Sequence, residues 1–214
     1  MAFFPETDLY CITDYAHSNG RTNIEVVRKM IDSGIKIIQY REKSRSMREK
    51  LEECRIIRTL TKEAGVLFIV NDHIDLALLS EADGVHIGQD DLPASEVRKL
   101  TGNNKIIGIS THSPEQALGA EKEGVVDYIG AGPVFRTYTK KDVCEPVGLE
   151  FIDFVSSKIS LPFVAIGGIK EHNISDVLSH GAKCFALVTE ITGADSIEEK
   201  ILNLRNKLRN KGYR

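Results

Sequence analysis

Short apolar segments alternate with longer amphipathic segments along the whole chain. The short segments are rich in β-branched residues, as expected of strands that are buried on both faces of a sheet. They predict strands over residues 9–13, 35–40, 66–70, 84–87, 106–110, 128–131, 163–166 and 184–188. The longer segments predict helices, among them residues 24–33, 47–64, 113–123, 173–179 and 197–208.

The order of these segments predicts the architecture. Strand and helix alternate eight times, at about 27 residues per unit, and no Pro/Ser-rich linker divides the chain. Alternation of this kind predicts a parallel sheet, and eight units predict an α/β fold, a single-domain (β/α)₈ TIM barrel over residues 1–214. An open, doubly wound sheet is the alternative. No G-x-G-x-x-G follows the first strand, so a dinucleotide-binding version of that sheet is poorly supported.

Glycine stands where several of the helices should end, directly before the next strand. The pairs are Ser33-Gly34, Ala64-Gly65, Glu123-Gly124 and His180-Gly181. Glycine adopts the left-handed conformation that closes a helix, so these pairs support the predicted alternation.

Composition and charge narrow the range of functions. Hydrophobic residues make up 42% of the chain and charged residues 28%, the balance of a soluble globular protein. A formal charge of -3 gives no reason to expect nucleic acid or a membrane as a partner. The four cysteines form no C-x-x-C pair, which indicates reduced thiols. No segment resembles a signal peptide or a membrane span, and we expect a cytoplasmic protein.

Polar residues recur directly after the predicted strands, where a barrel of this type builds its active site. Gln39, Arg41 and Lys43 point the same way in an extended chain, so two cations and an amide can converge on one anion. A solvated charged loop is the alternative. Asp72 and Asp91 follow the third and fourth strands, and carboxylates beside an anion site suit Mg²⁺ shared with a pyrophosphate.

The neighbouring residues have more than one interpretation. His73 and His86 lack the spacing of a zinc site, and we expect them to pack or to form hydrogen bonds. We expect Asp90 to cap a helix or to face solvent, and Asp91 to turn inward. Ser110 ends the fifth strand without a nucleophile-elbow pattern, so its simpler use is a hydrogen bond to a phosphate.

The sequence also predicts a functional loop after the sixth strand and a second anion site after the seventh and eighth strands. The long polar loop over residues 132–142 follows the sixth strand and carries Thr137, Thr139 and Lys140. Gly167-Gly168 and Val188-Thr189 follow the last two strands, where barrels commonly hold phosphate through backbone N–H groups.

Together these motifs resemble the thiamine phosphate synthase (thiamine-phosphate pyrophosphorylase) family. The matching segments are residues 9–14, 39–43, 70–72, 82–93, 107–112, 132–135, 137–142 and 165–169. The resemblance implies a transferase that condenses 4-amino-5-hydroxymethyl-2-methylpyrimidine diphosphate with a (carboxy)thiazole phosphate. The products would be thiamine phosphate and pyrophosphate, with CO₂ from a carboxylated thiazole, by a dissociative substitution with Mg²⁺ as cofactor.

The resemblance also implies roles for individual residues. The pyrimidine diphosphate would be bound by Gln39, Tyr40, Arg41, Glu42, Lys43, Asn71, Ser110 and Lys140, of which Arg41, Lys43, Ser110 and Lys140 would be catalytic. Mg²⁺ would be bound by Asp72 and Asp91. The thiazole phosphate would be bound by Thr137, Tyr138, Thr139, Gly168, Val188 and Thr189.

The chain departs from the family pattern at two positions. Arg136 stands where the family usually has proline, and Thr189 stands where it usually has serine. Two other functions remain open: an isomerase resembling thiazole tautomerase, and a non-catalytic regulatory barrel that binds a phosphorylated ligand. Monomer and homo-oligomer are both compatible with the sequence.

Overall fold

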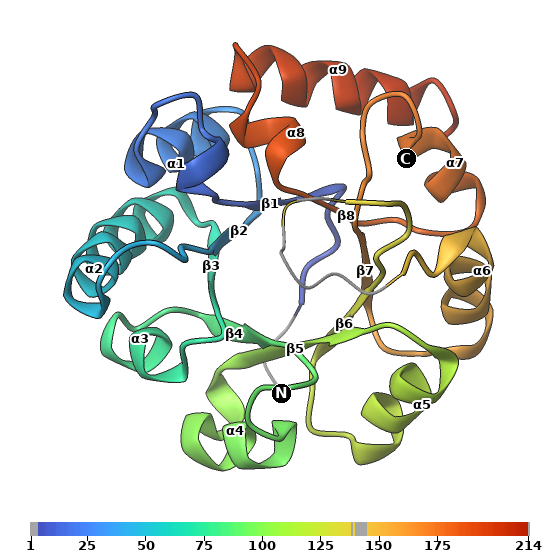
Figure 1. Cartoon of the computed structure of the whole chain (residues 1–214), viewed down its shortest axis with the longest axis horizontal. Coiled ribbons are helices and arrows are strands. Elements are labelled where there is room, and N and C mark those ends of the chain that lie inside the picture. Colours follow the sequence, from blue (N-terminus) through green and yellow to red (C-terminus); the bar gives the residue numbers. More distant parts are fainter. Residues whose placement is uncertain (1–3, 138, 140–144, 214) are drawn as a thin grey trace.

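The chain folds into a closed barrel of eight parallel strands. The structure, a computed structural model, describes residues 4–137, 139 and 145–213. Each strand pairs with the next along the chain, and β8 also pairs with β1, which closes the barrel (Figure 1). The strands are β1 Leu9–Ile12, β2 Ile37–Tyr40, β3 Leu67–Asn71, β4 Gly84–Ile87, β5 Ile106–Thr111, β6 Tyr128–Ala131, β7 Phe163–Ile166 and β8 Phe185–Leu187. The predicted (β/α)₈ barrel is confirmed, and the strand ends differ from the predicted ones by no more than two residues.

Helices surround the strands and cover the outer face of the barrel (Figure 1). They are α1 Asn23–Asp32, α2 Met47–Ala64, α3 Ile74–Leu79, α4 Ala94–Thr101, α5 Pro114–Glu123, α6 Gly148–Lys158, α7 Ile174–Ser179, α8 Thr189–Thr192 and α9 Ile197–Arg209, with 3₁₀ turns at Tyr15–His17 and Gly102–Asn104. Capping boxes fix the first turns of α1 and α2, because Thr22 and Ser46 exchange hydrogen bonds with the glutamates three residues later. At the other end of α2, Gly65 takes a φ of 65°, which confirms its predicted role as a helix terminator.

Side chains alternate between the barrel interior and the layer beneath the helices. In β1, Tyr10 and Ile12 point into the barrel, whereas Leu9 and Cys11 pack in the core shared with the helices. The amino-terminal half of the interior is filled by aliphatic side chains and two tyrosines, Tyr10 and Tyr128. The ring of Phe4 stacks on that of Tyr128 at 4.3 Å between centroids, so the barrel has a packed interior and is not a pore.

Carboxylates secure the amino-terminal rim of the sheet. Asp127 precedes β6, and its Oδ2 accepts hydrogen bonds from the Ile107 N–H of β5 at 2.8 Å and from Arg98 of α4 at 2.6 Å. Asp83 precedes β4 and accepts in the same way from Phe68 of β3 and from a helix arginine. Each carboxylate satisfies a backbone N–H at the start of a strand and ties a covering helix to the sheet.

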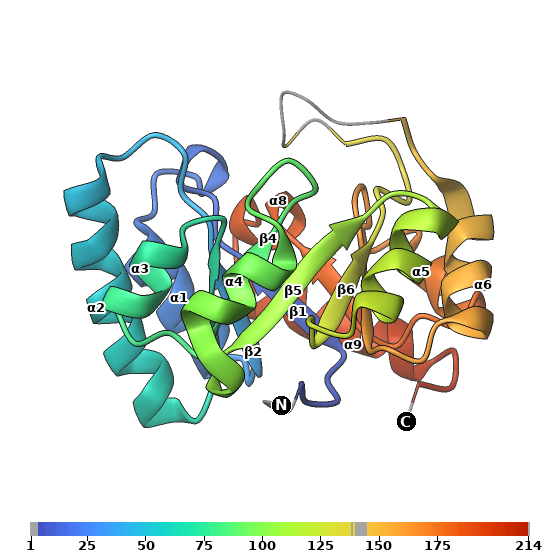
Figure 2. The ribbon, with the colours of Figure 1, turned by 90° about the horizontal axis from the view of Figure 1, so that it is seen from below.

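The two ends of the barrel differ in what they carry. Figure 2 shows the loops that follow β2 and β4 rising above the sheet, while both chain termini lie below it. The carboxyl ends of the strands therefore form a mouth on one side only. In the described part of the chain, no helix combines the length and the apolar character needed to cross a membrane.

The barrel interior leaves no room for a side chain at Gly108, because a Cβ there would overlap the ring of Tyr128 on the paired strand. We expect Gly108→Ala to lower the free energy of unfolding by about 1–3 kcal/mol, the usual effect of overpacking a core. Gly119 lies within α5 with open space around it. Gly119→Ala should raise the free energy of unfolding by about 0.5–1 kcal/mol through lower chain entropy. Urea unfolding of both variants checks this, and equal effects would contradict the described packing.

Candidate active site

Most of the predicted site residues that the structure describes lie at the mouth, and they come from strands that are far apart in the sequence. Gln39 and Tyr40 end β2, and Arg41 to Lys43 follow it. Asn71 ends β3, and Asp72 follows it. Asp91 follows β4, and Ser110 lies near the end of β5. This placement results from the parallel order of the strands, which puts every carboxyl end on the same rim.

Arg41 is held rigidly at the start of the loop after β2. Its side chain is buried, and Nη1 lies 3.1 Å from Oδ2 of the buried Asp14. Its backbone N–H donates to Thr13 Oγ1 at 2.9 Å, and that hydroxyl donates back to the Arg41 carbonyl at 3.2 Å. The Nε–H of Arg41 finds no hydrogen-bond partner within the described residues. The guanidinium is thus fixed on one side and keeps a buried donor for an anion.

Lys43 and Asp72 form an ion pair at the mouth, with 2.7 Å between Nζ and Oδ2. Asp72 takes a φ of 61°, a left-handed conformation that aspartate tolerates better than most residues. Its N–H donates to the carbonyl of His86 at 2.8 Å. The end of β3 is therefore bound to the end of β4, and Asp72 stands beside a cation at a defined place on the rim.

Asp91 is the second predicted metal ligand. Its Oδ2 accepts a hydrogen bond from the Gly88 N–H at 2.7 Å, so the carboxylate folds back over the end of β4. Asp72 and Asp91 are thereby both anchored to the segment 86–88. Among the described residues, no group of three or more His, Cys, Asp or Glu side chains could hold a metal ion. Mg²⁺ commonly needs only one or two carboxylates when substrate phosphates complete its shell, so this pair has suitable chemistry.

Tyr40 and Glu42 face away from the mouth, toward α1 and α2. Tyr40 Oη donates to Glu53 Oε2 at 2.7 Å, and Asn23 Nδ2 donates to Glu42 at 3.1 Å and to Glu53 at 3.0 Å. Glu42 also accepts from the N–H and Oγ of Ser44, each at 2.7 Å. Burial raises the pKa of Glu42, but these hydrogen bonds outweigh it and lower the pKa overall. The geometry therefore favours a supporting role, in which both side chains hold the loop that carries Arg41 and Lys43.

A line of hydrogen bonds crosses the barrel interior beneath the mouth. Gln39 Nε2 lies 2.7 Å from Tyr10 Oη, which lies 2.9 Å from Tyr128 Oη. Tyr128 Oη is 2.9 Å from His86 Nδ1, and His86 Nε2 is 3.0 Å from Ser110 Oγ. We call these five residues the interior relay. His86 is confirmed as a hydrogen-bonding histidine.

Sequence reasoning missed Asp14, Tyr10 and Tyr128. Each lies in or next to a strand, where the sequence pattern predicts only a core residue or a loop residue. For the two tyrosines, the signal was a hydroxyl-bearing ring at an inward position of an otherwise aliphatic strand, where the buried hydroxyl requires a partner. For Asp14, the signal was its position directly after the predicted strand 9–13.

The paired glycines after β7 have a structural reason as well as the predicted one. Gly167 and Gly168 take φ values of 99° and 65°, and the N–H of Phe135 donates to the Gly167 carbonyl at 2.9 Å. A Cβ at Gly168 would overlap Phe135 and the backbone of Arg136. The glycines thus let the loop after β6 lie directly on the loop after β7. Thr189 begins α8 immediately after β8, and the first N–H groups of a helix have no partner within that helix.

The threonines of the loop after β6 lie together, with 3.3 Å between the Oγ1 atoms of Thr137 and Thr139. The predicted ligands Tyr138 and Lys140 lie outside the described residues.

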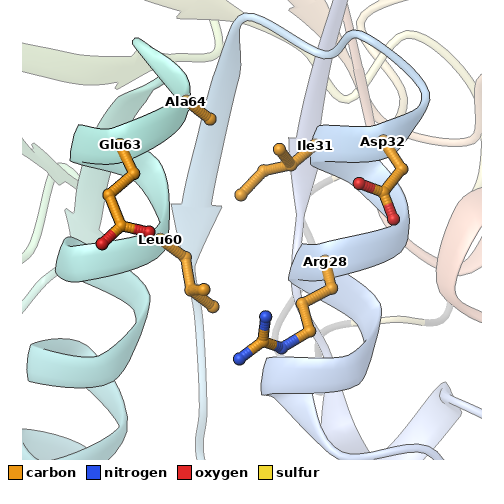
Figure 3. Close-up of a pocket in the computed structure, with 6 residues that line it drawn as sticks. All are labelled: Arg28, Ile31, Asp32, Leu60, Glu63 and Ala64. Carbon is orange, nitrogen blue, oxygen red and sulfur yellow. The ribbon is translucent and has the colours of Figure 1, made fainter.

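A separate groove lies on the outer wall of the barrel, between the last turns of α1 and α2 (Figure 3). It is lined by Arg28, Ile31, Asp32, Leu60, Glu63 and Ala64. None of these was predicted as a site residue. The helices run opposite to the strands, so their last turns lie at the end of the barrel away from the mouth.

Comparison with known proteins identifies the family of this chain. A family model described as thiamine monophosphate synthase matches residues 9–191. A thiamine-phosphate synthase of Pelotomaculum thermopropionicum is 67% identical over 94% of this chain and 91% of its own length. One from Lawsonia intracellularis is 57% identical over 95% of this chain and 93% of its own length. The solved thiamine phosphate pyrophosphorylase of Pyrococcus furiosus superposes with a TM-score of 0.86 at 36% identity, covering 96% of both chains. The chain therefore belongs to the thiamine monophosphate synthase family.

Proposed function

We propose that this enzyme condenses 4-amino-5-hydroxymethyl-2-methylpyrimidine diphosphate with a thiazole phosphate, forming thiamine phosphate and pyrophosphate. The observation that carries the proposal is the arrangement of Arg41, Lys43 and Asp72 on one side of the mouth. A buried guanidinium with an unused donor lies in the same short loop as an ammonium group paired to a carboxylate. This arrangement suits a diphosphate and its metal ion better than a neutral substrate.

The diphosphate would bind across the ends of β2, β3 and β5. Arg41 would offer its Nε–H and remaining N–H groups to phosphate oxygens while Asp14 holds the other side of the guanidinium. Lys43 would supply a point charge, and Asn71 and Ser110 would add an amide and a hydroxyl. Lys140, outside the described residues, would supply a further cation.

Asp72 and Asp91 would hold Mg²⁺ against the diphosphate. When bound, the ion neutralises negative charge on the departing pyrophosphate. Lys43 would hold the Asp72 carboxylate in place, because the two side chains are already paired at 2.7 Å.

The reaction would be a dissociative substitution. The bond between the pyrimidine methylene carbon and the diphosphate oxygen breaks, and its electron pair leaves with pyrophosphate. The thiazole nitrogen then donates its lone pair to the resulting cation and forms the new C–N bond. With a carboxylated thiazole, CO₂ would also leave, and a proton would take its place on the ring. Arg41 and Lys43 would stabilise the charge that develops on the leaving group, so a side-chain nucleophile is not required.

The thiazole phosphate would bind on the opposite side of the mouth. Thr137 and Thr139 would offer hydroxyls, and Gly168, Val188 and Thr189 would offer backbone N–H groups at the ends of β7 and β8. Tyr138, outside the described residues, belongs to the same predicted set. The contact between the loops after β6 and β7 would bring both groups of ligands to one phosphate.

The direct test of the proposal is to mix both substrates with the purified protein and to follow pyrophosphate release and thiamine phosphate formation, with and without Mg²⁺. We expect stoichiometric release of pyrophosphate that requires both substrates and Mg²⁺. Proton exchange on the thiazole without pyrophosphate release would support a tautomerase instead. Binding without turnover would support a regulatory barrel.

Replacement of Asp72 separates the metal site from the fold. Asparagine also tolerates the left-handed conformation, so Asp72→Asn should fold normally and lose only the charge. We expect kcat to fall by more than about 100-fold, beyond the effect of losing an outer-shell partner of a metal. Residual activity should require more Mg²⁺. The control is Asp32→Asn, an exposed carboxylate on the outer groove, which should keep normal turnover and Mg²⁺ dependence. Equal Mg²⁺ titration curves for both variants would refute the metal assignment.

Replacement of Arg41 tests the guanidinium. Lysine keeps the charge but cannot hold Asp14 and a phosphate at the same time. We expect Arg41→Lys to lower kcat/KM for the pyrimidine diphosphate by about 10²–10³-fold, as for loss of one preorganised donor. The matched variant Arg28→Lys, on the outer groove, should behave as the unmodified enzyme. Steady-state kinetics of both variants measures this effect. A normal kcat/KM in Arg41→Lys would show that Arg41 does not bind the diphosphate.

A further inference from the structure

The interior relay ends at Ser110, a predicted ligand of the diphosphate, and its buried members are not explained by substrate binding. Five residues on five strands connect Gln39 to Ser110 through two tyrosines and a histidine, with each step between 2.7 and 3.0 Å. Tyr10 and Tyr128 are almost completely buried, at 1% and 0% exposure. Such a line of polar groups in a barrel interior needs a reason beyond packing.

The hydrogen-bond roles along the relay follow from its first step. The Gln39 amide nitrogen can only donate, so Tyr10 Oη accepts from it at 2.7 Å. We assign the Tyr10 proton to Tyr128 Oη, its neighbour at 2.9 Å, because a buried hydroxyl needs an acceptor for its proton. Tyr128 in turn gives its proton to His86 Nδ1 at 2.9 Å.

The remaining steps fix the histidine and the serine. With Nδ1 accepting, the His86 ring carries its proton on Nε2 and donates it to Ser110 Oγ at 3.0 Å. The Ser110 oxygen is thereby an acceptor within the relay. The hydroxyl proton of Ser110 is not used within the relay, so it can be donated to an acceptor at the mouth.

If the protons were donated in the opposite direction along the relay, Ser110 would present lone pairs to the anion instead of an O–H group. If every proton ran the other way, Ser110 would donate to His86, and its lone pairs would face the mouth. Lone pairs repel phosphate oxygens, whereas an O–H group binds them. The direction of the relay therefore decides whether Ser110 attracts or repels a diphosphate.

Burial keeps both tyrosine hydroxyls protonated, and packing holds the Tyr128 ring in its orientation. Burial raises the pKa of both hydroxyls, so they stay protonated over the whole physiological range. Phe4 stacks on one side of the Tyr128 ring, and the absence of a side chain at Gly108 makes room for it on β5. Tyr128 thus cannot turn away from His86 without a clash.

We propose that Tyr128, supported by Tyr10, is a positioning residue that fixes the Nε2–H tautomer of His86 and so presents the Ser110 hydroxyl as a hydrogen-bond donor to the substrate diphosphate. The identity of this ligand rests on the proposed function, whereas the tautomer of His86 does not. Neither tyrosine needs to touch the substrate.

The test compares conservative tyrosine variants by two independent measurements. In Tyr128→Phe, His86 Nδ1 loses its donor, so ¹⁵N NMR of the imidazole should show loss of the pure Nε2–H form. The signal is assigned by its absence in His86→Gln. We expect kcat for pyrophosphate release to fall by about 10–100-fold, as for loss of an outer-shell partner. KM for the thiazole phosphate should stay unchanged, because its predicted ligands lie in the loops after β6, β7 and β8 and none of them belongs to the relay.

Two further variants provide a weaker perturbation of the relay and a control. Tyr10→Phe leaves Tyr128 able to donate to His86, so the tautomer should persist and kcat should fall less than in Tyr128→Phe. Tyr213→Phe is the matched control, since it removes a single tyrosine hydrogen bond, to the Lys183 carbonyl at 2.8 Å, which lies outside the relay and at the end of the barrel away from the mouth. It should change neither measurement, and thermal unfolding of all variants checks that the barrel is intact.

The outcomes separate this proposal from the proposed function. An unchanged His86 spectrum or an unchanged kcat in a folded Tyr128→Phe would overturn the positioning role. Failure of the unmodified enzyme to release pyrophosphate would contradict only the proposed function, and loss of the Nε2–H form in Tyr128→Phe would still support the relay.

Discussion

Hydrogen bonding between β8 and β1 is the constraint on which the rest of the structure depends. It turns a row of parallel strands into a closed barrel, so all the carboxyl ends meet on one rim. Without that closure the ligands predicted for the two substrates would lie at opposite edges of an open sheet. Closure also gives the interior a fixed width, which aliphatic side chains, Tyr10 and Tyr128 fill. The same pairing thus creates both the mouth and the packed layer beneath it.

The two ends of the strands carry different kinds of residue, because only the carboxyl ends are open to solvent. The amino-terminal half of the interior is sealed by packing such as Phe4 on Tyr128, whereas Arg41, Lys43 and Asp72 stand at the other end. Charged groups are held by partners supplied by the loops themselves, as Asp14 holds Arg41. Because these partners are already in place, the binding of an anion as proposed would need little reorganisation, which is the basis of electrostatic preorganisation.

Much of this architecture could be predicted from the sequence, because it depends on local patterns. The alternation of apolar strands with amphipathic helices, and glycine at helix ends such as Gly65, predicted the barrel and which polar residues reach the rim. Partners across strands could not be predicted. The pairing of Tyr10 with Tyr128, 118 residues apart, depends on the register of strands around the closed sheet. The orientation of Tyr40 and Glu42 toward Glu53 likewise depends on where α2 packs.

The complementary sizes of residues 108 and 128 have a consequence for protein engineering. Gly108 and Tyr128 are partners in the β5–β6 register, and the tyrosine ring fills the space that the glycine leaves empty. The summed side-chain volume at the two positions is therefore what the packing of the interior fixes. A redesign that moves bulk from position 128 to position 108 could keep the interior filled while deleting the hydroxyl. Such an exchange would allow the polarity of the layer beneath the mouth to be changed independently of the shape of the barrel.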